Sequence, residues 1–283
     1  MSKEREQSLK DRVREIAKEQ GRTFNDVWKT LVLERFLVRL SRSQYLDRLI
    51  FKGGMLLSKY LPLRRETVDL DFLAKGIRAE AAAIHEAISS VLQVSIEDGF
   101  TFASIDVAEA LQPHMDYQGF SVTAVAQIGG TKTAISLDIG VGDVVEPQDK
   151  AIALARTKAR PVYEDAVSLK VYPPEFIFSE KLETIHYRGA MNSRMKDFYD
   201  LWRMIGSEGL LDPAKLSTAI RLTFEQRETP LNARIEFAEP EIARLEGAWR
   251  SFRAGLASAE TLPVTLAEVL EGLNRRMLGV IAE

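Results

Sequence analysis

Two aspartates with one residue between them are the first candidates for chemistry. Asp69 and Asp71 lie in the run TVDLDFL, residues 67–73, where polar and apolar residues alternate. The alternation predicts a strand with both carboxylates on one face and with Leu70 and Phe72 in the core. The Cα atoms of the two aspartates would be about 6–7 Å apart, so the carboxylates could share one or two divalent cations. Because like charges repel, the pair indicates either such a metal site or a solvated strand edge.

A third acid is available in a second alternating run, AISLDIGVG, residues 134–142. Asp138 is flanked there by Leu137 and Ile139, and it would complete a set of three carboxylates for a two-metal site. A polar residue on a half-solvated sheet would give the same pattern, and Asp143, after the glycines, is the reserve candidate. The chain has no cysteine and only three histidines, which are far apart in sequence, so we expect oxygen ligands and magnesium.

A pair of glycines follows a short apolar run that begins at Leu49. Gly53 and Gly54 precede a helix-forming stretch that ends at Pro62, which predicts a strand, a tight turn and a helix. Free backbone N–H groups at a helix start can hold phosphate oxygens, although a plain turn has the same sequence. The pattern of a Walker A loop is absent from the sequence, so phosphate binding here would use a different architecture.

Charged residues on two predicted helices of the second half are further candidates. Lys181 rises from the apolar face of its helix, where its ammonium must reach solvent, a phosphate or an acid. Asp197 and Asp200 are one helical turn apart on the next helix. A salt bridge of either acid to Arg194 or Lys196 is the simpler explanation for the aspartates.

The predicted elements indicate an α+β fold. Apolar residues spaced by three and four predict helices over 6–20, 23–41, 78–93, 174–188, 193–206, 213–227, 237–256 and 264–280. Period-two alternation and turn residues predict strands over 49–51, 67–73, 100–108, 118–128 and 132–141. We therefore expect a mixed-sheet domain with N-terminal helices over residues 1–160 and a helical domain over 161–283. In the second helix, we expect Arg35, Arg39 and Arg42 to face outward.

Charge and hydropathy exclude some classes of protein. Residues 1–50 hold 12 Lys and Arg against 8 Asp and Glu, whereas residues 78–150 hold 3 against 11, and the whole chain has a net charge of −3. A basic N-terminal segment can face a polyanion, but a solvated helix face explains it equally well. The first 15 residues have no apolar segment and no apolar run approaches 20 residues, so we expect a cytoplasmic protein without a membrane segment.

Five blocks together resemble the AbiEii/AbiGii family of toxin nucleotidyltransferases. They occur in the family's order, between about residues 10 and 230, and they are FKGGMLLS (51–58), RETVDLDF (65–72), LDIGVGD (137–143), EKLETI (180–185) and SRMKDFYDL (193–201). The resemblance implies a fold like that of DNA polymerase β nucleotidyltransferases. It also implies a toxin of an abortive-infection toxin–antitoxin pair, and the best-described members transfer nucleotides to tRNA 3′ ends.

The resemblance assigns roles to individual residues. Gly53 and Gly54 match the glycine pair that binds the triphosphate, with Ser58 as a nearby helper. The second position of that pair is glycine here, where many members have a serine, so backbone N–H groups would take over the contacts of the lost hydroxyl. The remaining matches are Asp69 and Asp71 with the metal-binding acids, Arg65 and Thr67 with the residues before them, Asp138 with the third acid of the sheet, Lys181 with a nucleotide-contacting lysine, and Asp197, with Asp200 less securely, with the acid of the last motif.

The expected activity is magnesium-dependent transfer of a nucleoside monophosphate from an NTP to an acceptor, with pyrophosphate leaving. By the resemblance, the acceptor would be a tRNA 3′ end or another RNA, and the partner would be an antitoxin such as an AbiEi-like transcriptional regulator. Two alternatives stay open at this point. One is a phosphotransferase or a protein-modifying nucleotidyltransferase on the same fold, and the other is a catalytically silent module that binds RNA or an antitoxin.

Overall fold

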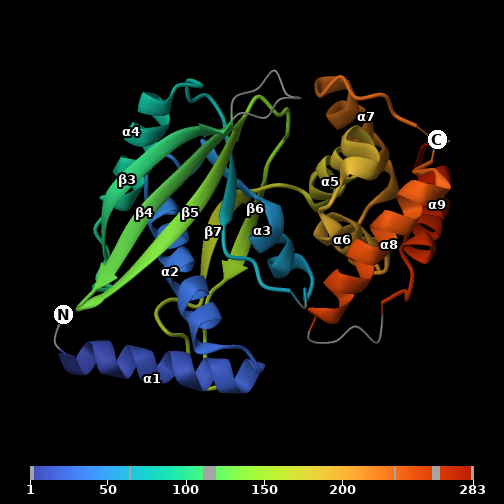
Figure 1. Ribbon diagram of the computed structural model, residues 1–283. Helices are drawn as coiled ribbons and strands as arrows, with labels where there is room; N and C mark the ends of the chain where they lie inside the picture. Colours follow the sequence, from blue (N-terminus) through green and yellow to red (C-terminus); the bar gives the residue numbers. More distant parts are fainter. Residues whose placement is uncertain (1–2, 64, 111–118, 233, 257–261, 282–283) are drawn as a thin grey trace. The chain divides into compact units, whose positions relative to one another are not determined.

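The computed structural model describes residues 3–63, 65–110, 119–232, 234–256 and 262–281, which form two compact units (Figure 1). Unit 1 comprises residues 1–59, 66–142 and 146–172, and unit 2 comprises residues 60–65, 143–145 and 173–283. The chain therefore leaves unit 1 for two short segments before it enters unit 2 for the last time. The units divide after Tyr172, not at the expected position near residue 160.

Unit 1 is built on a seven-stranded mixed sheet with the strand order β3-β4-β5-β2-β1-β7-β6. β2 and β7 run parallel to their neighbours β5 and β1, respectively, and the remaining neighbours are antiparallel. The strands are β1 (Leu49–Lys52), β2 (Leu70–Ala74), β3 (Thr101–Ala110), β4 (Gly119–Ile128), β5 (Thr131–Val141), β6 (Gln148–Ala153) and β7 (Ala166–Val171). This order places β1, which precedes the glycine turn, and β2, which carries Asp71, in the middle of the sheet.

Helices cover one face of this sheet. The helices of unit 1 are α1 (Lys3–Gln20), α2 (Phe24–Leu40), α3 (Gly53–Tyr60) and α4 (Ala81–Leu92). α2 packs against α4, and it also contacts β5 and β7. The ring of Phe36 on α2 lies 5.5 Å from that of Phe72, which lies 5.6 Å from that of Phe51, so this face of β1 and β2 is the core. Side chains at the alternate positions of β1 and β2, including Lys52 and Asp71, therefore point to the other face.

Unit 2 is helical in its described residues. Its elements are α5 (Pro174–Arg188), the short 3₁₀ helix η1 (Gly189–Met191), α6 (Met195–Ile205), α7 (Pro213–Gln226), α8 (Glu239–Ala254) and α9 (Leu266–Ile281). α5 packs on α6 and α7, and α9 packs on α6, α7 and α8. The buried aromatic residues of this core include Phe178, Phe198 and Trp249. No described helix of either unit has both the length and the apolar character that crossing a membrane requires.

The α+β prediction is confirmed, as are the helices and the five expected strands, with shifts at their ends. β2 begins at Leu70, later than the predicted residue 67, so Asp69 lies just before the strand. β6 and β7 are not among the strands expected from the sequence. β7 pairs with β1 through Phe51 and Val171, and this pairing keeps the chain up to Tyr172 in the sheet unit.

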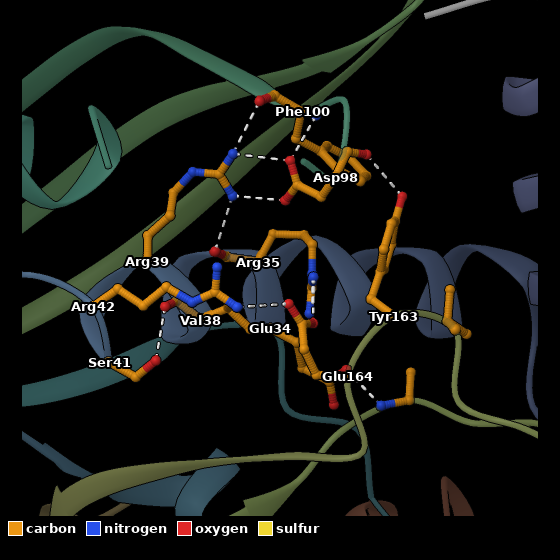
Figure 2. A network of polar contacts seen from close by, with 12 residues as sticks. Glu34, Arg35, Val38, Arg39, Ser41, Arg42, Asp98, Phe100, Tyr163 and Glu164 are labelled. Carbon is orange, nitrogen blue, oxygen red and sulfur yellow. Dashed lines mark hydrogen bonds and ion pairs between the residues drawn. The ribbon is translucent and has the colours of Figure 1, made fainter. Parts of the chain in front are cut away.

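The expectation that the arginines of α2 face outward is wrong for two of them. The side chains of Arg35 and Arg39 are 1% and 2% exposed, and Figure 2 shows both among polar partners from distant segments. Arg39 donates two hydrogen bonds to the carboxylate of Asp98, at 2.8 and 3.0 Å, and Arg35 donates one to Glu164, at 2.8 Å. Burial is tolerated because these charges are paired. Arg42 is exposed, as expected.

Candidate active site

The turn between β1 and α3 holds its backbone against an acidic side chain of β2. Gly53 has a φ of +75°, which favours glycine, and a Cβ at this position would overlap the carboxylate of Asp71. Residue 53 must therefore be glycine, both because of this backbone conformation and because the carboxylate of Asp71 leaves no space for a Cβ. Gly54 continues into the first turn of α3, where backbone N–H groups have no helical acceptor and can bind an anion.

Asp71 and Asp138 are direct neighbours across the parallel strands β2 and β5. Adjacent strands lie about 4.8 Å apart and residues in register point to the same face, so both carboxylates project side by side. Asp71 is partly buried and Asp138 is exposed. Lys52 of β1 is the partner of Asp71 on its other side, and Ser121 of β4 is the partner of Asp138. These four residues form a polar row across the centre of the sheet.

The other sequence-predicted residues of unit 1 lie around this row. Asp69 and Thr67 belong to the segment that leads into β2, and both are partly buried. Ser58 is on α3, and its hydroxyl donates a 2.7 Å hydrogen bond to the carbonyl of Met55 in its own helix. The structure thus brings Gly53, Asp71 and Asp138 together. It leaves the assigned roles of Asp69, Thr67 and Ser58 as predictions.

The pair Asp71 and Asp138 fits a magnesium ion that is bound together with a nucleotide. Magnesium in such sites takes one or two carboxylates, several waters and phosphate oxygens of the substrate. Within the described residues, no three His, Cys, Asp or Glu side chains are gathered into one metal-binding group. Asp69, Asp71 and Asp138 are therefore not gathered into one such group, whereas Asp71 and Asp138 are two adjacent oxygen donors beside the glycine turn.

In unit 2, Lys181 of α5 binds both acids of α6. Its Nζ atom lies 2.8 Å from Oδ1 of Asp197 and 2.9 Å from Oδ2 of Asp200. The two carboxylates are 1% and 0% exposed, and the lysine side chain is 12% exposed. The sequence allowed this ammonium to reach solvent, a phosphate or an acid, and in the structure it contacts two acids. An ammonium has three donors, and these two aspartates use two of them.

Two arginines complete this cluster. Arg65 forms a bidentate pair with Asp200, with its Nε atom 2.8 Å from Oδ1 and its Nη2 atom 2.5 Å from Oδ2. Arg194 places its Nε atom 2.9 Å from Oδ2 of Asp197, one of the salt bridges considered from the sequence. The structure therefore uses the guanidinium of Arg65 to bind Asp200, and its expected contact with the nucleotide stays a prediction.

The charges of this cluster stabilise one another against the cost of burial. Burial opposes the charged form of Lys181, but the carboxylates of Asp200 and Asp197 outweigh it and raise the pKa of the ammonium. Burial likewise opposes ionisation of Asp197, and Lys181 and Arg194 outweigh it, so the pKa of this carboxyl is lowered. Both groups are therefore charged at neutral pH. A lysine held as a cation in this way can bind a phosphate oxygen.

The reserve candidate Asp143 belongs to a different cluster of unit 2. It lies 3.3 Å from the Nη2 atom of Arg227, which also pairs with Glu180 at 3.3 Å and with Glu183 at 2.9 Å. Burial opposes the charge of Arg227, and Glu180, Asp143 and Glu183 outweigh it and raise the pKa of the guanidinium. The single charge of this buried arginine thus offsets part of the charge of the three acids, and the structure gives Asp143 a structural partner.

Comparison with known proteins was made for the sequence and for the fold. No curated protein matches the chain. Among solved structures, MenT4, a nucleotidyltransferase toxin from Mycobacterium tuberculosis, is similar with a TM-score of 0.56 and 16% sequence identity, over 94% of this chain and 88% of MenT4. JHP933 from Helicobacter pylori is similar with a TM-score of 0.53 and 12% identity, over 92% of this chain and 93% of that protein. At these identities the likeness shows a shared fold.

The sequence match is more specific. The profile of the family described as "Nucleotidyl transferase AbiEii toxin, Type IV TA system" matches residues 35–271. This range includes the glycine turn, the carboxylates of β2 and β5, and the cluster around Lys181. The chain belongs to the AbiEii family, the nucleotidyltransferase toxins of type IV toxin–antitoxin systems.

Proposed function

We propose that this nucleotidyltransferase toxin transfers a nucleoside monophosphate from an NTP to the 3′ end of a tRNA, in the cytoplasm and with magnesium. The observation that carries the proposal is the register of Asp71 with Asp138, beside a glycine turn pressed against Asp71. Two oxygen donors next to a phosphate-binding turn suit the triphosphate of an NTP better than an uncharged substrate. The tRNA acceptor rests on the resemblance to the family alone.

In the proposed reaction, the chain binds the triphosphate and moves one proton. The N–H groups of the turn at Gly53 and Gly54 hold phosphate oxygens. Asp71 and Asp138 would hold magnesium, which would supply positive charge against that developing on the phosphates. The terminal hydroxyl of the acceptor attacks the α-phosphorus, the new O–P bond forms, and the bond to the bridging oxygen breaks with loss of pyrophosphate. The proton of the hydroxyl passes to the carboxylate of Asp138, which is exposed beside that of Asp71, or, where Asp138 is a magnesium ligand, to water.

The roles of Lys181 and Asp197 follow the resemblance. Lys181 contacts Asp197 and Asp200, and by the resemblance its ammonium would also donate to a phosphate oxygen. In this proposal Asp197 acts by keeping the ammonium charged and in place. An AbiEi-like transcriptional regulator is the proposed antitoxin partner.

The test incubates the purified protein with total cellular RNA, magnesium and each α-labelled NTP in turn. Asp71→Asn, which keeps the size of the side chain, should abolish labelling of tRNA-sized RNA. Asp69→Asn measures separately whether the acid before β2 is needed. The matched control is Asp149→Asn, an exposed acid of β6 that pairs with Lys170, and it should label RNA as the wild type does.

The other outcomes would change the acceptor, the site or the function that is proposed here. Label on protein instead of RNA would replace the tRNA acceptor with a protein acceptor. Label that survives Asp71→Asn would contradict the proposed site. Binding of RNA without any transfer, at equal affinity for wild type and Asp71→Asn, would favour a catalytically silent binding module.

A further inference from the structure

Lys52 is the one basic residue in the polar row of the sheet. It is the last residue of β1 and the register partner of Asp71, whose other partner is Asp138. Residues in register share a face, so the lysine and both carboxylates project from the side of the sheet opposite the aromatic core. Two strand spacings, about 10 Å, contain the Cα atoms of all three residues.

The position of the ammonium shows which way this side chain reaches. The Nζ atom lies 4.9 Å from the ring centroid of Tyr172 and 3.8 Å from the place where a Cβ of Gly140 would be. Gly140 is on β5, and β2 lies between β1 and β5. To come so close to Gly140, the lysine side chain must extend over β2, the strand of Asp71, toward the strand of Asp138.

Two neighbours favour this position. Tyr172 is fully buried, so its ring is a fixed surface for the cation, and the cation–π contact stabilises the ammonium there. Gly140 brings no long side chain to this part of β5; even a Cβ would be in ordinary contact with the ammonium, at 3.8 Å, and a larger side chain would compete for its place. Lys52 itself is partly buried, so its charge acts at a lower effective dielectric than in water.

We infer that Lys52 is the built-in counter-cation of Asp71 and Asp138. In the free protein its ammonium supplies the positive charge that the paired carboxylates require, and it thereby competes with a divalent cation. When a nucleotide binds, its phosphates give the ammonium an alternative partner and give the metal further ligands. Lys52 is thus a positioning residue that makes tight metal binding depend on the nucleotide. This inference rests on the proposed function for its magnesium site.

The test measures metal affinity in the absence of nucleotide, with Mn²⁺ as the probe, by electron paramagnetic resonance of free Mn²⁺ and by the Mn²⁺-dependent shift in melting temperature. Removing one positive charge beside the site in Lys52→Met should tighten Mn²⁺ binding at least about tenfold. Lys52→Arg keeps the charge and should bind Mn²⁺ as weakly as the wild type. Melting in a chelator establishes that each variant is folded.

The matched control is Lys59→Met. Lys59 pairs with a buried acid, since its Nζ atom lies 3.0 Å from Glu34, but it is on α3 and outside the polar row. Its replacement should lower the melting temperature without changing the affinity for Mn²⁺. A purely structural role of Lys52 would give the same result for Lys52→Met.

Two results would overturn the inference. The first is that Lys52→Met folds and binds Mn²⁺ no more tightly than the wild type, whether both bind it or neither does. Alternatively, the tighter binding in Lys52→Met could persist after Asp71→Asn is added, which would place the metal elsewhere. The RNA-labelling assay of the wild type is independent of both results, so a failure of the proposed transfer is recognised separately.

Discussion

Replacing Gly53 with alanine adds one methyl group and should destabilise the fold in two ways. The φ of +75° costs an L-residue about 1–2 kcal/mol. The new Cβ would also overlap the carboxylate of Asp71, and relieving such an overlap costs about 1–3 kcal/mol. We therefore expect Gly53→Ala to lower the free energy of unfolding by about 2–5 kcal/mol, at about 2–4 °C in melting temperature per kcal/mol.

The overlap also predicts an effect on activity. The chain can relieve it only by moving the turn or the carboxylate, and both are parts of the proposed phosphate and metal site. Transfer of labelled nucleotide, assayed well below the melting temperature of the variant, should therefore fall by more than tenfold, since about 1.4 kcal/mol of lost transition-state stabilisation is a tenfold change.

Gly21 provides the matched control for this prediction. It has a similar φ of +63°, but nothing lies within 4 Å of the place where its Cβ would be. Gly21→Ala should therefore show the backbone penalty alone and keep its activity. If Gly53→Ala loses no more stability than Gly21→Ala and transfers nucleotide normally, then Asp71 does not lie against the turn and the reasoning about this site is wrong.

Two further predictions concern buried ionisable side chains, one in each unit. Arg39→Met leaves Asp98 buried without its bidentate partner and should lower the free energy of unfolding, measured by chemical denaturation, by about 3–5 kcal/mol. Arg78→Met removes an exposed ion pair with Glu80 and should change this free energy little. Equal effects of the two substitutions would contradict the buried pairing of Arg39 with Asp98. Burial lowers the pKa of His186 to about 4 from about 6.5 in the unfolded chain, so stability should be complete above pH 6.5 and decline by about 3 kcal/mol as the pH falls to 4. His186→Phe should remove this decline in pH-dependent melting, and a slope that the variant leaves unchanged would assign it to other groups.

The sequence predicts local features of this fold better than pairings between distant segments. The aspartate strand, the glycine turn and most helices follow from periodicity and turn residues, because these signals lie within about ten residues. β7 has the same kind of signal in its alternating AVSLKV, although it is not among the expected strands. β6 has almost none, since Ile152 is its one buried residue.

Long-range pairing explains what could not be predicted. In the sequence, Arg35 and Arg39 occupy helix positions that the apolar periodicity assigns to solvent. Their partners, Glu164 and Asp98, are 129 and 59 residues away along the chain. In the same way, the adjacency of Asp71 and Asp138 depends on the parallel pairing of β2 with β5, which periodicity does not reveal. Lys52 was overlooked because its importance comes from the same register, although it immediately precedes the glycine pair.

The strand order also has a consequence for synthesis on the ribosome. β1 lies between β2, which follows it within about 20 residues, and β7, whose Val171 pairs with Phe51 from 120 residues further along. At a synthesis rate of about 5–20 residues per second, β7 is made roughly 6–24 s after β1, and one edge of β1 cannot pair with it before then. Asp200, the partner of Arg65, is made later still. A nascent chain thus carries its glycine turn and acids well before the structure that orders them is complete, so we expect the toxin to become competent only late in its own translation.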